Sequence, residues 1–288
     1  MERDRRRKLL FHKIFLGILV GGFGLALFFL IGVLMASDII TAEAKIPKEN
    51  TECGFCEENI KIILAEEEAE REAEHARKLA EATGIVYLTF DDGPGDYTNA
   101  LLDVLNKYEI KATFFVTGRG DDVAIKREFD EGHMVALHTW SHNYAYVYSS
   151  IDNYFADLNQ IAERVRNITG KEAKLIRFPG GSSNLVSRRY DGRTKIMSTL
   201  TREVETRGYQ YFDWNIDSDD AGRTKDSDTV FVNVASHLKP GANVVLQHDI
   251  YDYSVAAVER IIQYGIENGY MFEPLSLDSP TVHHRVNN

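Results

Sequence analysis

Hydrophobic and polar positions alternate along residues 84–278 in a way that predicts strands and helices in turn. Short apolar runs typical of buried strands occur at 85–90, 112–117, 134–139, 174–178, 209–216, 242–247 and 270–275. Longer amphipathic stretches typical of helices lie between them at 98–108, 121–131, 151–168, 195–207, 228–238 and 254–268. This βαβα order indicates an α/β fold with a parallel sheet. Seven such units in about 200 residues predict a barrel or near-barrel.

The pattern before this domain predicts a membrane anchor. Residues 14–36 form an uncharged run of 23 residues, long enough to cross a hydrocarbon core of about 30 Å as a helix. The run is longer than a signal-peptide core, so we expect an uncleaved transmembrane helix; cleavage after Ala44 is the minor alternative. The basic segment 1–13 should stay in the cytoplasm, which places the rest of the chain outside the cell membrane as a single-pass extracellular protein.

Residues 37–83 are predicted to form an extracellular linker and a charged helical stalk. From Asn59 to Thr83 the chain is rich in Glu, Ala, Lys and Arg and lacks Gly and Pro, which indicates a long solvated helix. Its apolar positions are too sparse for a firm coiled coil, so a single helix is the default and a dimeric stalk is the alternative. Cys53 and Cys56 have no second cysteine pair for a zinc site, and outside the cell a local or inter-chain disulfide is expected.

Composition and charge narrow the classes of partner. A hydrophobic content of 44% excludes disorder throughout the chain. The net charge of −11 hides an asymmetry, because residues 1–13 hold six basic and two acidic residues. Beyond them, 27 basic and 42 acidic residues give a net charge of −15. A body this acidic repels nucleic acid and favours a neutral or cationic substrate.

Candidate chemistry begins where the first predicted strand ends. The apolar run 85–90 stops at Asp91 and Asp92, and the turn Gly93-Pro94 follows. Adjacent carboxylates repel each other unless a cation or a base partner separates their roles, so this pair predicts that one binds a metal and the other moves protons. The alternative is a turn cap, since Asp-Asp-Gly is ordinary turn chemistry.

Histidines follow two other predicted strands. His138 and His142 are four residues apart, a spacing that suits a metal, and with Asp92 they would leave positions open for water and substrate. His248 ends the run 242–247 at the same mouth. This set favours metal-assisted hydrolysis of an amide or ester, in which Asp91 takes a proton and His248 protonates the leaving group.

These residues lie in five ordered motifs, TFDDGP (89–94), HTWSH (138–142), RFPGG (177–181), WNIDSDD (214–220) and LQH (246–248). On these motifs the chain from about residue 85 to 277 resembles the polysaccharide deacetylases of carbohydrate esterase family 4, the NodB-homology domain. The resemblance implies a distorted (β/α)7 TIM-like barrel over residues 84–278. It also implies a divalent metal, commonly zinc or cobalt, and removal of acetyl groups from N-acetylated sugars.

The resemblance assigns a role to each matched residue. Asp91 is the general base, and Arg177 orients it. The metal ligands are Asp92, His138 and His142.

Further roles follow from the later motifs. His248 is the general acid, and the resemblance makes Asp220 the carboxylate that raises its pKa. The backbone N–H of Gly180 helps to hold the tetrahedral oxyanion, and Leu246 lines the acetyl pocket.

Two positions depart from the family pattern. The third motif usually has an aromatic residue after its proline, where this chain has Gly180. The fourth usually ends Asp-Trp, where this chain has Ala221 and lacks an expected wall of the acetyl pocket. Trp214, Trp140 or a tyrosine could compensate, and a different acyl group is the alternative.

The leading hypothesis is a membrane-anchored hydrolase that removes N-acetyl groups from a cell-wall polysaccharide, with peptidoglycan as the expected substrate. One alternative is an acetyl-xylan-type O-deacetylase that uses the same metal and water on an ester. Another is a catalytically silent glycan-binding protein, suggested by Ala221. The remaining histidines, His283 and His284, lie in the polar tail 279–288 and are expected to be disordered rather than ligands.

Overall fold

The computed structural model describes residues 54–192 and 195–288. The predicted basic segment, the anchor at 14–36 and most of the linker lie outside the described residues, as does Cys53. None of the described helices is long and apolar enough to cross a bilayer.

Helix α3 (Gly54–Glu81) covers the predicted stalk. From Ile60 to the end of the helix every side chain except Ile63 is exposed. Ion pairs between neighbouring turns, such as Arg77 with Glu74 at 2.8 Å, lie on its surface. The prediction of a solvated, charged helix is confirmed, and pairing of two stalks stays a prediction.

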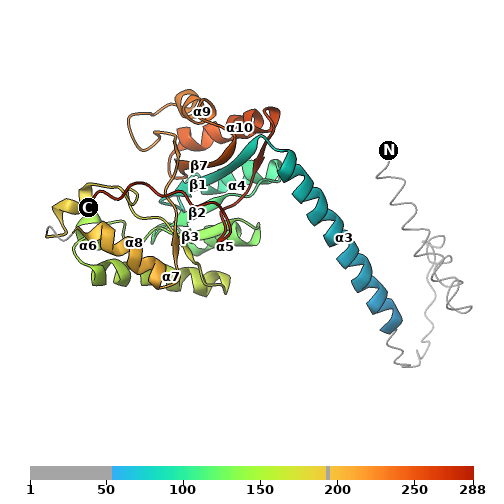
Figure 1. Cartoon of the computed structure of the whole chain (residues 1–288), viewed down its shortest axis with the longest axis horizontal. Coiled ribbons are helices and arrows are strands. Elements are labelled where there is room, and N and C mark those ends of the chain that lie inside the picture. Colours follow the sequence, from blue (N-terminus) through green and yellow to red (C-terminus); the bar gives the residue numbers. More distant parts are fainter. Residues whose placement is uncertain (1–53, 193–194) are drawn as a thin grey trace, which may run out of the picture. The chain divides into compact units, whose positions relative to one another are not determined.

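The chain after α3 alternates strands with helices (Figure 1). The strands are β1 (Gly84–Asp91), β2 (Thr113–Val116), β3 (Met134–Leu137), β4 (Leu175–Ile176), β5 (Gln210–Tyr211), β6 (Ile216–Asp217), β7 (Gly241–His248) and β8 (Tyr270–Phe272). The helices are α4 (Thr98–Lys107), α5 (Asp122–Asp130), α6 (Tyr144–Val147), α7 (Ile151–Thr169), the 3₁₀ helix η1 (Val186–Arg189), α8 (Ile196–Thr206), α9 (Ser227–Ala235) and α10 (Asp252–Glu267).

All strand pairs are parallel, in the order β5-β4-β3-β2-β1-β7-β6. Strand β1 lies inside the sheet, between β2 and β7, and pairs with β7 along its whole length. Strand β8 also pairs with β1, at Gly84–Val86, before β2 begins its pairing at Thr89. The sheet curls without hydrogen bonds between β5 and β6. This is the curled, parallel half-barrel expected of a distorted (β/α)7 fold.

One predicted strand is wrong. The run 209–216 was expected to be a single strand, and the structure divides it into β5 and β6 at opposite ends of the sheet order. The linking residues cross the open side of the barrel with Phe212 and Asp213 fully buried. Because Phe212 and Asp213 are as buried as strand residues, the residue types of this run do not distinguish it from a strand.

Alternate residues of β1 serve two separate cores. Val86, Leu88 and Phe90 belong to the large hydrophobic cluster beneath the helices. Tyr87 belongs to a smaller cluster with residues of other strands, including Phe115 and Val244. Side chains two apart on a strand share a face, so β1 carries Thr89 and then Asp91 toward the barrel interior.

The C-terminal residues 279–288 contact the barrel instead of forming a free tail. The N–H of Asp213 donates to the carbonyl of Val282 at 2.8 Å. The ring of His283 stacks on Tyr211 with 3.7 Å between centroids. The expectation that the two tail histidines are disordered is therefore wrong. The physical reason is that the open side of the barrel offers unpaired backbone groups and exposed rings to this segment.

Candidate active site

Strand β1 ends in two carboxylates that point to different partners. Asp91 is 2% exposed, and its Oδ1 accepts a hydrogen bond from Arg177 at 2.8 Å. The backbone of Asp92 has a φ of 73°, a left-handed conformation that is strained for a residue with a Cβ. This turn of the backbone carries the Asp92 carboxylate toward His138 and His142. The second oxygen of Asp91, Oδ2, also lies 3.7 Å from His138 Nε2, so the Asp91–Arg177 pair borders the same site.

Asp92, His138 and His142 converge as the sequence predicts. One ligand atom from each lies within 4.8 Å of the other two. Asp92 Oδ1 is 3.4 Å from His142 Nε2 and 3.7 Å from His138 Nε2. It is buried and has no hydrogen-bond partner. An acceptor in that position is costly unless a cation or proton satisfies it.

The three residues fit a divalent cation. His138 Nδ1 lies 2.8 Å from the backbone carbonyl of Arg177; donation of Nδ1–H to that oxygen leaves Nε2 as a free ligand atom. Burial lowers the pKa of His142 to about 4, so its imidazole stays neutral and able to bind a metal. Donors held about 2 Å from one tetrahedral ion lie about 3.3 Å apart, close to the separations found here.

A buried aspartate fixes the loop that holds the two histidines. Asp157, on α7, accepts hydrogen bonds from the backbone N–H groups of Trp140 at 2.6 Å and Ser141 at 3.0 Å. No motif in the sequence marks this residue. An acidic side chain on the buried face of α7, beside Tyr154 and Leu158, was the signal that could have identified it.

Arg177 is fully buried and links Asp91, the candidate general base, to neighbouring strands and loops of the barrel. Its guanidinium donates to Asp91 Oδ1 at 2.8 Å and to Thr89 Oγ1 at 2.7 Å. It also donates to the backbone carbonyls of Phe212 and Asp213. These bonds hold Asp91 in one orientation and keep its charge paired.

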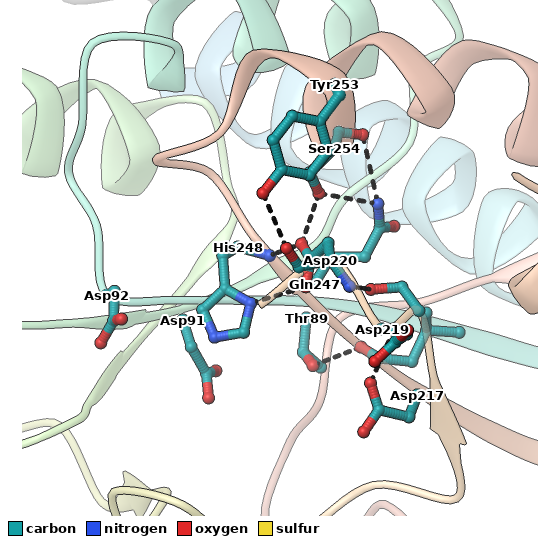
Figure 2. A network of polar contacts seen from close by, with 12 residues as sticks. Thr89, Asp91, Asp92, Asp217, Asp219, Asp220, Gln247, His248, Tyr253 and Ser254 are labelled. Carbon is teal, nitrogen blue, oxygen red and sulfur yellow. Dashed lines mark hydrogen bonds and ion pairs between the residues drawn. The ribbon is translucent and has the colours of Figure 1, made fainter. Parts of the chain in front are cut away.

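His248 lies opposite Asp91, because the two residues are register partners in β1 and β7. Its Nδ1 is 2.8 Å from Asp220 Oδ1, and its backbone N–H donates to Asp220 Oδ2 at 2.7 Å. Figure 2 shows two further contacts to Asp220: Ser254 donates to the same Oδ2, and Tyr253 donates to the backbone carbonyl oxygen. Burial opposes the charged imidazole, but Asp220 outweighs it and raises the pKa of His248 to about 9. The imidazole is therefore a proton donor at neutral pH.

The predicted pocket residues lie beside this centre. Leu246 shares a strand face with His248 and is buried. Trp214 packs over the loop after β4, since a Cβ at Gly181 would lie 3.0 Å from its ring. Gly180 is exposed in that loop, and Ala221 is also exposed and forms no wall.

The C-terminal segment, residues 279–288, holds Trp214 in place. His284 Nε2 is 2.6 Å from the carbonyl oxygen of Trp214, and the two rings meet edge to face at 4.8 Å. The backbone N–H of His284 donates to Asp213 Oδ2, and Ser182 donates to the same carboxylate. No periodic pattern in residues 279–288 signalled these contacts.

Comparison with known proteins places these residues in a family. Residues 78–197 match the model of the polysaccharide deacetylase family. The peptidoglycan-N-acetylglucosamine deacetylase of Bacillus cereus is 33% identical over 252 residues, which cover 84% of this chain and 86% of that protein.

Two solved structures share the fold. The catalytic domain of the peptidoglycan N-acetylglucosamine deacetylase from Eubacterium rectale is 50% identical, with a TM-score of 0.68 over 71% of this chain and 94% of that one. The polysaccharide deacetylase Bc1974 from Bacillus cereus is 34% identical, with a TM-score of 0.61 over 70% of this chain and 97% of that one. With these levels of identity and coverage, the chain belongs to the polysaccharide deacetylase family.

Proposed function

We propose that this protein hydrolyses the N-acetyl groups of N-acetylglucosamine residues in peptidoglycan, with zinc as the metal. One observation carries the proposal. The triad of Asp92, His138 and His142 lies beside Asp91, a carboxylate held by an arginine. Asp91 is in turn the register partner of His248, an imidazole held by a carboxylate. The names of the relatives from Bacillus cereus and Eubacterium rectale support the choice of polymer.

Each side chain has a defined part in the reaction. Asp92, His138 and His142 would hold the metal, which when bound supplies a Lewis acid at the acyl carbonyl and lowers the pKa of water. Two imidazoles and one carboxylate suit zinc. Water adds to the carbonyl carbon and gives its proton to Asp91, which Arg177 keeps in place.

His248 completes the reaction. The imidazolium gives a proton to the amide nitrogen as the C–N bond breaks, and the products are acetate and a free amine on the sugar. The backbone N–H of Gly180 would stabilise the charge that develops on the carbonyl oxygen, while Leu246 and Trp214 would enclose the acetyl group.

Chelation tests the proposal directly. Because the buried Asp92 Oδ1 has no protein partner, removal of the metal should abolish acetate release by the full-length chain in detergent. Added zinc or cobalt should restore it. The substrates to compare are N-acetylated glycan strands of peptidoglycan, chitin oligomers and O-acetylated xylan, with acetate measured enzymatically.

The outcomes separate the alternatives. Release from xylan alone would identify an O-deacetylase. Tight glycan binding without metal-dependent release would identify a binding protein. Turnover that survives complete removal of metal would contradict the metal assignment.

The pH dependence of kcat/KM tests the acid. His248 donates a proton, so activity should hold below its folded pKa of about 9 and fall as pH rises through that value. Asp220→Asn removes the largest of the charges that raise this pKa, and leaves only Asp91 and Asp92 to oppose burial. The variant should therefore lose activity at a lower pH than the wild type.

Asp217→Asn is the matched control for this shift. Asp217 is exposed, and its side chain caps the N–H of Asp219 without contacting His248. Its pH profile should match the wild type. An Asp220→Asn profile that also matches the wild type would remove Asp220 from this role.

We also propose that residues 14–36 anchor the protein in the cell membrane with the catalytic domain outside, supported by the uncharged run behind a basic segment. Cell fractionation with protease applied to intact cells tests both points. The domain should remain with the membrane fraction and be digested from the outside.

A further inference from the structure

Tyr144 begins α6 two residues after His142 and lies against the metal triad. Its ring meets His142 edge to face, with 5.3 Å between centroids and an angle of 89°. The side chain of Asn143 caps the helix by accepting from the N–H groups of Ala145 and Tyr146. The cap fixes the start of α6 and therefore the backbone position of Tyr144.

The hydroxyl of Tyr144 occupies the space beside Gly180. A Cβ at Gly180 would lie 2.9 Å from Tyr144 Oη and 3.3 Å from its Cε1. Gly180 also has a φ of 74°, which residues with a Cβ rarely adopt. The glycine and the tyrosine are therefore complementary: the first leaves the room that the second fills.

No neighbouring side chain in the described part of the chain binds the hydroxyl of Tyr144. Tyr148, one turn later in the chain, donates its own hydroxyl to the carbonyl of Pro179 at 2.7 Å. Tyr144 packs on Tyr148 with 5.8 Å between ring centroids, but its hydroxyl has no hydrogen-bond partner among residues 54–192 and 195–288. A half-buried phenol with a free O–H beside a reactive centre is a donor that a ligand can use.

We propose that the Tyr144 hydroxyl donates a hydrogen bond to the acyl carbonyl oxygen of the substrate, next to the backbone N–H of Gly180. The inference rests on the proposed function, because only an acylated substrate brings a carbonyl oxygen to this position. Tyr144 then supplies from α6 the aromatic group that the third motif lacks at residue 180. A donor aimed at an oxygen that gains charge contributes most in the transition state.

Tyr144→Phe in the full-length chain isolates the hydroxyl from the ring. We expect kcat to fall about 10- to 100-fold, below the 10²–10³-fold loss typical of a principal oxyanion donor. KM should stay within about threefold, as for an interaction made in the transition state. Metal content and unfolding temperature should be unchanged, since the ring still packs on His142.

Tyr146→Phe is the matched control, because Tyr146 lies on the same short helix, is exposed and offers an equivalent hydroxyl. Its kinetics should equal the wild type.

Each result decides the matter. Wild-type kcat in Tyr144→Phe, with an active parent, overturns the hydrogen bond while the proposed function stands. A kcat loss accompanied by loss of metal shows that Tyr144 only supports His142, which also overturns it. A parent that releases no acetate from any glycan overturns the proposed function, and this inference with it.

Discussion

Asp91→Asn is expected to lower kcat by about 10²- to 10⁴-fold, the range for loss of a general base. Asparagine has the same shape and can still accept from Arg177, which donates to Asp91 Oδ1 at 2.8 Å. It cannot take a proton from water. Because Asp92 and the two histidines are untouched, metal content and KM should change little.

Asp96→Asn is the control for this substitution, since Asp96 follows in the same turn region and is exposed. Initial rates of acetate release, with metal content measured on the same preparations, provide the comparison. An Asp91→Asn variant within tenfold of the wild-type kcat would show that another group accepts the proton.

Arg177→Met is expected to produce the largest loss of stability. The substitution leaves the carboxylate of Asp91 buried and unpaired, and it removes donors from the carbonyls of Phe212 and Asp213. Removal of one partner from a buried ion pair costs about 3–5 kcal/mol. For a domain of this size each kcal/mol lowers Tm by about 2–4 °C, so a fall of roughly 6–20 °C is expected in thermal unfolding.

Arg166→Met provides the matched control, because Arg166 is exposed on α7. Its Tm should stay near the wild type. The double variant Asp91→Asn with Arg177→Met should lose less stability than the two single losses combined, because no unpaired charge remains. A wild-type Tm in Arg177→Met would show that the buried pair contributes nothing to folding.

The sequence was most informative where a strand ended in polar residues. Parallel strands present their carboxyl ends at one edge, so Asp91 and His248 could be expected to meet before their register in β1 and β7 was known. His138 directly follows β3 and is expected at this edge for the same reason. Residue types then limited the chemistry to metal binding and proton transfer.

Hydrophobic patterning gave a wrong prediction where a segment is buried without forming a helix or a strand. The run 209–216 is apolar because it crosses the open side of the barrel, and only its two ends form strands. Asp157 and Tyr144 were missed because each acts across the fold, on loops that its own neighbours in sequence do not reveal.

By itself, the sequence of this protein determined the order of strands and helices, the charged helix before them and the five motifs that carry the chemistry. Periodicity and residue type express these features locally. The tertiary structure decided where the chain breaks between β5 and β6, how residues 282–284 support Trp214, and which tyrosine lies beside Gly180. These depend on contacts between residues far apart in the chain, whose energies arise only when packing brings their surfaces together.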